Sequence, residues 1–94
     1  MSRQIIISRT AFLDIEQSVD YYKNQQKGLG RRFENQAHST FKKIQQFPFA
    51  ASFAFDEVRY KLIDKFPYII LYEFDEVNIY ILRVFHTNQS PDKL

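Results

Sequence analysis

The sequence predicts an α+β domain of two layers, in which a helix hairpin packs on an antiparallel sheet in the order β-α-α-β-β-β. Two observations lead to this fold class. The first half of the chain carries apolar residues at helical spacing in two stretches, which are separated by the only two glycines, Gly28 and Gly30. The second half holds three runs rich in β-branched and aromatic residues, joined by short turns. The apolar stripes of the helices need a sheet face to cover, and the strands supply one.

The chain begins with a β-rich run at residues 3–8, after which Ser8 or Thr10 can cap a helix. We expect that helix over residues 11–27, with Asp14 in its first turns, where the helix dipole favours anions. Its apolar stripe consists of Phe12, Ile15, Val19 and Tyr22.

A second helix should follow the glycine pair and end at Pro48. Gly28 suits a left-handed C-cap of the first helix, and Gly30 would release the chain into the second. One stripe of apolar residues runs along this helix: Phe33, Ala37, Phe41, Ile44 and Phe47. Because only a few residues link the two helices, they should form an antiparallel hairpin.

Residues 48–56 fit neither a helical nor a strand period, so we expect an apolar loop. Its three phenylalanines, Phe49, Phe53 and Phe55, would form a lid over the core or an exposed patch for a partner, and the lid is the preferred interpretation. Three strands follow, at 57–63, 68–74 and 77–86, joined by tight turns into an antiparallel meander. The polar tail after them should be frayed.

Composition sets the outer limits of the interpretation. Ninety-four residues make one small domain over residues 1–94, and 45% hydrophobic residues predict a folded globule. The chain has no cysteine, and no apolar run approaches the ~20 residues of a membrane span. We therefore expect a soluble cytoplasmic protein that binds no membrane, metal or cofactor. A net charge of +2 permits an acidic or nucleic-acid partner but does not require one.

Several short motifs occur in a recognisable order along almost the whole chain. They are "YY" at 21–22, "GLGRRF" at 28–33, "IQQFP" at 44–48, Arg59 ahead of "FPYIILY" at 66–72, "LRVFH" at 82–86, and Pro91. In this order and spacing the chain resembles the RelE/ParE toxin superfamily of type II toxin–antitoxin modules, specifically its ParE-like branch. The fold that the resemblance implies agrees with the order β-α-α-β-β-β.

The resemblance implies a toxin that a small cognate antitoxin neutralises by wrapping around it. The expected assembly is a homodimer of the toxin or a hetero-oligomer of toxin and antitoxin. Characterised ParE members, which belong to plasmid stabilisation modules, poison DNA gyrase. RelE-like members instead cleave messenger RNA in the ribosomal A site, and many relatives have no established activity.

Arg59 and Lys61 lie two residues apart in a predicted strand, so both should project from one face of the sheet. We expect this basic face to be left free by the helices, as a target-binding patch that includes Arg83. The alternative is an ordinary solvated face.

Arg83 alternates with Ile79, Ile81 and Phe85, so it should share a strongly apolar face, where an arginine is paired, reaches the rim or serves a site. The alternative role is a structural ion pair with Glu57 or Glu73. His86 should lie on the opposite face from Arg83, as an acid or base or as a hydrogen-bond partner of a turn.

The resemblance also carries a departure that bears on activity. RelE-like members place an Arg after the tyrosine of the middle strand, where this chain has Ile69 after Tyr68, and a basic cluster after the last strand, where this chain has "HTNQSPDK". We therefore predict a toxin that acts by binding, with DNA gyrase as target. The alternative is a ribosome-dependent endoribonuclease with His86 as acid or base and Arg83 on the phosphate. A second alternative is an inactive member that retains only antitoxin binding.

Overall fold

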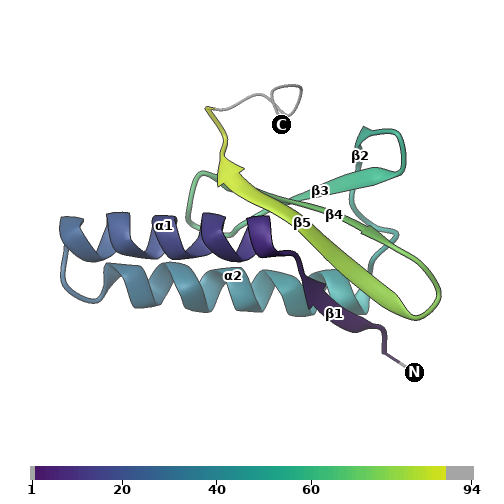
Figure 1. Cartoon of the computed structure of the whole chain (residues 1–94), viewed down its shortest axis with the longest axis horizontal. Helices are drawn as coiled ribbons and strands as arrows, with labels where there is room; N and C mark the ends of the chain where they lie inside the picture. The colour runs from purple at the N-terminus through teal and green to yellow at the C-terminus, as the bar shows by residue number, and fades with distance from the viewer. Residues whose placement is uncertain (1, 89–94) are drawn as a thin grey trace.

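A computed structural model describes residues 2–88 of the chain, and two helices pack on one face of a five-stranded mixed sheet (Figure 1). The elements are β1 (Gln4–Ile7), α1 (Arg9–Gln25), α2 (Leu29–Gln46), β2 (Phe53–Phe55), β3 (Val58–Leu62), β4 (Tyr68–Phe74) and β5 (Asn78–His86). The predicted α+β class, helix hairpin and meander of three strands are confirmed. The expected fraying of the tail, and the motif residue Pro91, concern residues 89–94, which lie outside the described part.

The sheet order is β1-β5-β4-β3-β2, and it corrects the predicted sheet in two places. First, β1 pairs with β5 in parallel, from Gln4 opposite Asn78 to Ile7 opposite Ile81, so the sheet is mixed rather than antiparallel. Second, residues 53–55 of the predicted loop form β2, which pairs with β3 in antiparallel fashion. Alternation over three residues is too short to identify such a strand from sequence.

Ser8 connects the first helix to the sheet. Its hydroxyl accepts a hydrogen bond from the Ala11 N–H at 3.0 Å and donates one to the Leu82 carbonyl, also at 3.0 Å. The first bond caps α1, as expected of a serine at this position. The second fixes the start of α1 against β5. Neither helix in residues 2–88 is long and apolar enough to cross a bilayer.

The main core lies between the helices and the sheet. Phe33, Ala37, Phe41 and Ile44 are buried against strand residues such as Tyr72 and Ile79, which confirms most of the predicted stripe of α2. Two stripe residues were predicted wrongly, because Phe12 at the start of α1 and Phe47 at the end of α2 are 53% and 68% exposed. Ala11 and Ile15 on either side of Phe12 are buried, so Phe12 lies on the outer side of α1, whereas Phe47 is the residue that ends α2.

Aromatic rings fill the core beneath the turn between the helices. Tyr22 stacks on Phe33 with the ring centroids 5.4 Å apart, and Phe66 and Tyr68 meet both rings edge-on. Burial, and then the neighbouring Tyr68, raises the pKa of Tyr22 to about 12. Neutral tyrosine is therefore part of the folded core.

The two glycines between the helices have different roles. Gly28 adopts the predicted left-handed conformation, with φ of 83°, but it is the N-cap of α2 and not the predicted C-cap of α1, which is Gln26. Gly30 lies inside α2 and is buried, which corrects its predicted place before the helix. A Cβ at Gly30 would lie 2.7 Å from the Val19 carbonyl oxygen of α1, so the absence of a side chain sets the helix separation.

We expect Gly30→Ala to lower the free energy of unfolding by about 1–3 kcal/mol, because the added methyl group meets backbone rather than a flexible side chain. A loss of stability would be informative, because Ala normally stabilises a helix interior by about 1 kcal/mol relative to Gly. Urea denaturation followed by circular dichroism measures the change, with Ser39→Ala on the exposed side of α2 as control. A gain in stability for Gly30→Ala would show that the hairpin can separate freely.

Alkaline pH should destabilise the fold through Tyr22. Its folded pKa of about 12 exceeds the usual 10.0, so its contribution is complete below pH 10.0 and is lost as pH rises through about 12. Tyr22→Phe removes the titrating hydroxyl and should flatten this part of the stability–pH curve. The exposed Tyr60 of β3 provides the control, because Tyr60→Phe should lose stability at high pH as the wild type does. Parallel curves for Tyr22→Phe and wild type would contradict this assignment.

Candidate functional site

Asp14 of α1 binds both Arg83 and the backbone of β5. The Arg83 Nε donates to Asp14 Oδ2 at 2.8 Å, and Nη2 donates to Oδ1 at 3.1 Å. The Val84 N–H also donates to Oδ2, at 2.9 Å. The Asp14 side chain is only 13% exposed, and its hydrogen bonds raise the pKa of Arg83 above its ordinary value. Arg83 therefore has an ion-pair partner, and the predicted partners Glu57 and Glu73 are wrong.

A bulge in β5 reverses the face on which Arg83 lies. Ile81 pairs with Tyr72, but Arg83 pairs with Leu71, the residue directly before Tyr72, so Leu82 is an extra residue in β5. Ile79 and Ile81 face the helices, whereas Arg83 is paired with Leu71, a residue of the opposite face of the sheet. The prediction that Arg83 shares a face with these isoleucines is wrong for this reason.

His86 and Arg83 both line one open depression of about 500 Å³ between α1 and the end of β5. The Nδ1 atom of His86 accepts a hydrogen bond from the Asn88 N–H at 3.0 Å, and its ring lies edge-on to Tyr68 at 5.3 Å. Tyr21 and Gln17 complete the wall on the side of α1. We call this the His86 depression. Its Arg83 and Asp14 side chains neutralise each other.

Arg59 is bound to the loop that follows α2. Its Nη1 donates to the carbonyl oxygens of Ala51 at 2.7 Å and Phe49 at 3.2 Å. The guanidinium carbon lies 4.0 Å from the centre of the Phe53 ring. Burial raises the pKa of Tyr72, which pairs with Arg59 across β3 and β4, and the Arg59 charge opposes that rise. Arg59 thus holds the loop and β2 against the sheet.

Lys61 lies on the same side of β3 as Arg59, as predicted, but this side faces the helices. Arg59 pairs with Tyr72 and Lys61 with Ile70, and both partners belong to the core under the hairpin. The predicted basic face free of helices is therefore wrong in its placement. Lys61 is only partly buried, because it lines a depression of about 380 Å³ at the end of α2, together with Lys43 and Phe47.

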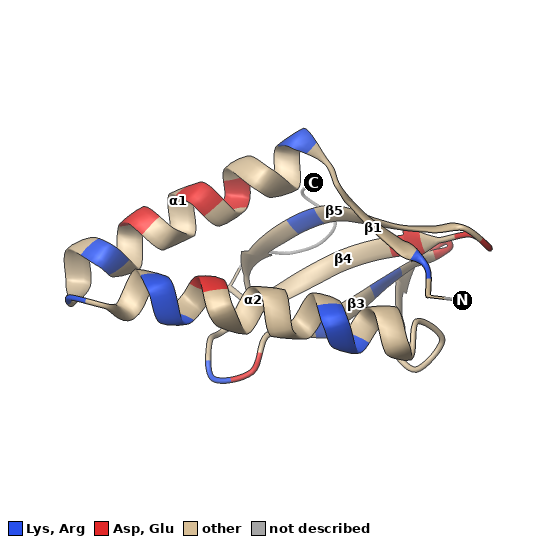
Figure 2. Ribbon diagram, turned by 90° about the horizontal axis from the view of Figure 1, so that it is seen from below, with Lys and Arg blue, Asp and Glu red and all other residues tan. Residues whose placement is uncertain are grey.

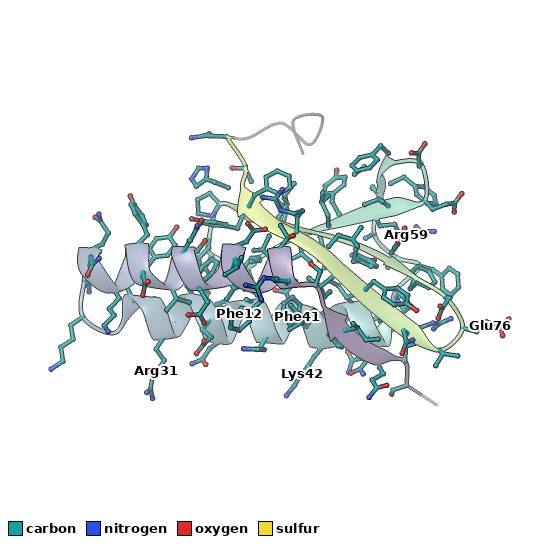
Figure 3. All side chains as sticks on the ribbon, viewed as in Figure 1. Phe12, Arg31, Phe41, Lys42, Arg59 and Glu76 are labelled. Atoms are coloured by element: carbon teal, nitrogen blue, oxygen red, sulfur yellow. The ribbon has the colours of Figure 1, made fainter. Side chains whose placement is uncertain are left out.

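The predicted site residues consequently gather in two places. Arg83 and His86 lie together near α1, whereas Arg59 and Lys61 lie on β3, across the central strand β4. Figure 2 shows the same separation of the basic residues, and Figure 3 shows Arg59 beside β3, well away from α1. His38 is exposed on α2.

Sequence reasoning did not single out Asp14 as a site residue. The one signal was Arg83 itself, since an arginine among apolar strand residues calls for a carboxylate partner. Sequence proximity favoured glutamates of the neighbouring strands, but β1 ends at Ile7 and leaves the edge of β5 beyond Ile81 to α1. That edge is where Asp14 lies.

The sequence matches, over residues 5–91, the family described as "ParE toxin of type II toxin-antitoxin system, parDE". The chain belongs to the ParE toxin family. A solved structure described as "Chromosomal ParDE TA system from P. aeruginosa" superposes with a TM-score of 0.76 at 19% sequence identity. The match covers 89% of this chain and 95% of that chain, and it shows a common fold. No curated protein is similar enough in sequence to match.

Membership of the ParE family confirms the superfamily and the branch that the motifs indicated. Several of those motifs have structural roles in this ParE-family chain: Gly28 and Gly30 of "GLGRRF" shape the hairpin, and Arg83 of "LRVFH" binds Asp14. Among residues 2–88, no group of three or more His, Asp and Glu side chains is placed to hold a metal ion.

We expect Asp14→Ala to destabilise the ParE-family fold by about 1–3 kcal/mol, because it leaves Arg83 and the Val84 N–H without their acceptor. Arg83→Met should cost less, since the bond to Val84 survives. The double variant should show coupling of roughly 1 kcal/mol in a urea-denaturation cycle. Glu16→Ala, exposed on the same helix, is the control and should change stability by at most about 0.5 kcal/mol. Strictly additive single variants would refute the pairing.

Proposed function

We propose that this chain is a toxin that acts by binding its target, that the target is DNA gyrase, and that a cognate antitoxin neutralises it in the cytoplasm. The observation that carries the binding mechanism is the bidentate pairing of Arg83 with Asp14. It engages the one arginine that lies beside His86 in the described residues.

Cleavage of RNA requires a cation that neutralises the scissile phosphate and groups that transfer protons at the attacking and leaving oxygens. In the His86 depression, Arg83 is the cation in place, and Asp14 already cancels its charge. The Nδ1 atom of His86 is occupied by the Asn88 N–H, so Nε2 alone would face a substrate. Arg59 is bound to carbonyl oxygens on another part of the sheet. This arrangement favours a binding toxin over a ribonuclease.

For the three predicted target-binding residues we propose different roles. Arg59 and Arg83 act indirectly, because each holds an element in place through its hydrogen bonds. Lys61 makes no side-chain hydrogen bond or ion pair among residues 2–88 and opens into a depression, so we assign it the direct contact with an acidic part of the target. The gyrase assignment itself rests on the characterised members of the ParE branch that the sequence resembles.

Purified chain should inhibit supercoiling by DNA gyrase and leave messenger RNA intact in a translation reaction. Lys61→Ala should weaken the inhibition by roughly tenfold, because it removes a charged contact at the interface. Lys27→Ala, an exposed cation at the turn between the helices, is the control and should inhibit as the wild type does.

His86→Ala separates the two mechanisms, since it should keep full inhibition of gyrase. Message cleavage that disappears in His86→Ala would replace this proposal with the endoribonuclease. A chain that inhibits neither gyrase nor translation and is harmless without the antitoxin would be an inactive member.

A further inference from the structure

Three phenylalanines are exposed where α2 ends and the chain turns towards β2. Phe47, Phe49 and Phe53 are 68%, 67% and 54% exposed, so the predicted lid over the core is wrong, and Phe55 is exposed as well. Phe49 lies edge-on to Phe74, and Phe53 stacks on Arg59. Phe47 makes no aromatic or cation–π contact among residues 2–88, so its ring is the freest of the three for a partner.

Phe47 lies between two apolar depressions of about 380 Å³ each. One is the depression of Lys61 and Lys43, and the other lies beside Arg3, Pro48 and Phe49. The two adjoin, since Gln46, Phe47 and Ala50 line both. We call this combined surface the Phe47 groove. Each half has room for one large apolar side chain, and Phe47 would separate the two.

All the charged side chains that line the Phe47 groove are cations: Lys43 and Lys61 in one half and Arg3 in the other. No carboxylate among residues 2–88 lines it. The nearby acidic turn after β4 meets Arg3 through a backbone oxygen, that of Asp75. Figure 2 shows basic residues on the C-terminal part of α2, on β3 and at the N-terminal end, whereas acidic residues follow one another along α1.

We propose that the Phe47 groove receives an acidic amphipathic segment of the antitoxin. This inference rests on the proposed function and names the surface through which neutralisation occurs. Two apolar side chains of the segment would occupy the two halves of the groove, and its carboxylates would meet Lys43 and Lys61. Because Lys61 is also the proposed contact with the target, a bound segment blocks that contact directly.

An antitoxin segment fits this surface better than two other occupants. A second copy of the chain would bring its own cationic groove, so the two grooves would repel each other in a twofold dimer, and only a head-to-tail contact could bring its acidic α1 surface to the groove. Single-stranded nucleic acid would use the lysines and the exposed rings, but one half of the groove is charged only by Arg3, whose Nε is engaged with Asp75. Self-association and nucleic-acid binding can each be distinguished from antitoxin binding by experiment.

The test measures the affinity of the chain for the full-length antitoxin, produced from the reading frame that adjoins the toxin gene, by isothermal titration calorimetry. Phe47→Ser should weaken binding by about tenfold or more, as expected for an aromatic anchor. Lys43→Glu should also weaken it by about tenfold, and the loss should shrink at high salt. Circular dichroism and thermal unfolding confirm that each variant is folded.

Matched controls exist for both substitutions. Phe12→Ser removes another exposed phenylalanine, from α1, and Lys42→Glu makes the same charge change next to Lys43. Figure 3 shows Lys42 pointing from α2 away from the sheet. Both controls should bind antitoxin within about twofold of wild type, a difference of ~0.4 kcal/mol.

The possible failures are distinguishable. Groove variants that bind antitoxin as well as the controls do overturn this inference and leave the proposed function standing. A wild-type chain that binds no antitoxin overturns the proposed function and this inference with it. The antitoxin assignment also fails if Phe47→Ser abolishes gyrase inhibition but keeps antitoxin affinity. It fails equally if Phe47→Ser instead converts a self-associated chain to monomer in sedimentation, or removes affinity for an oligothymidine strand.

Discussion

The carboxylate of Asp14 stabilises the part of β5 that β1 leaves without a backbone partner. β1 covers β5 only as far as Ile81, and from there the edge of β5 meets a helix, whose own backbone groups are already paired. Asp14 accepts a hydrogen bond from the Val84 N–H through Oδ2 at this edge, and it accepts from Arg83 through both carboxylate oxygens. One side chain therefore satisfies a backbone donor, neutralises a cation and connects α1 to β5.

The bulge at Leu82 makes this contact possible. Regular alternation would have directed Arg83 into the core with Ile79 and Ile81, where no carboxylate of the described residues lies. The extra residue keeps the isoleucines and Val84 in the core and places Arg83 among the residues of the opposite face of β5. From there its long side chain reaches α1. A catalytic position and a structural position can look the same in sequence. Here the surroundings of Arg83, rather than its residue type, decide between them.

The basic residues and the exposed aromatic residues then acquire separate roles. Arg59 holds the turn between α2 and β2 by binding two carbonyl oxygens, and this turn presents Phe47 and Phe49 to solvent. Lys43 and Lys61 are left beside the exposed rings, and no carboxylate among residues 2–88 lines the groove. An apolar surface with one sign of charge at its rim is a typical feature of a protein interface. The functional interest of this toxin family member lies at the end of α2 as much as on the sheet.

The amino-acid pattern by itself determined the fold class, the hairpin, the meander and the family, because periodicity and turn residues are local signals that the chain carries in order. It also determined that Arg59 and Lys61 share one side of β3. Only the tertiary structure decided which side that is, which carboxylate binds Arg83, and that Phe47 and Phe49 stay exposed. These outcomes depend on a parallel edge strand, a bulge of one residue and the end of a helix relative to the sheet. Each of them changes the surroundings of a side chain without leaving a periodic trace in the sequence.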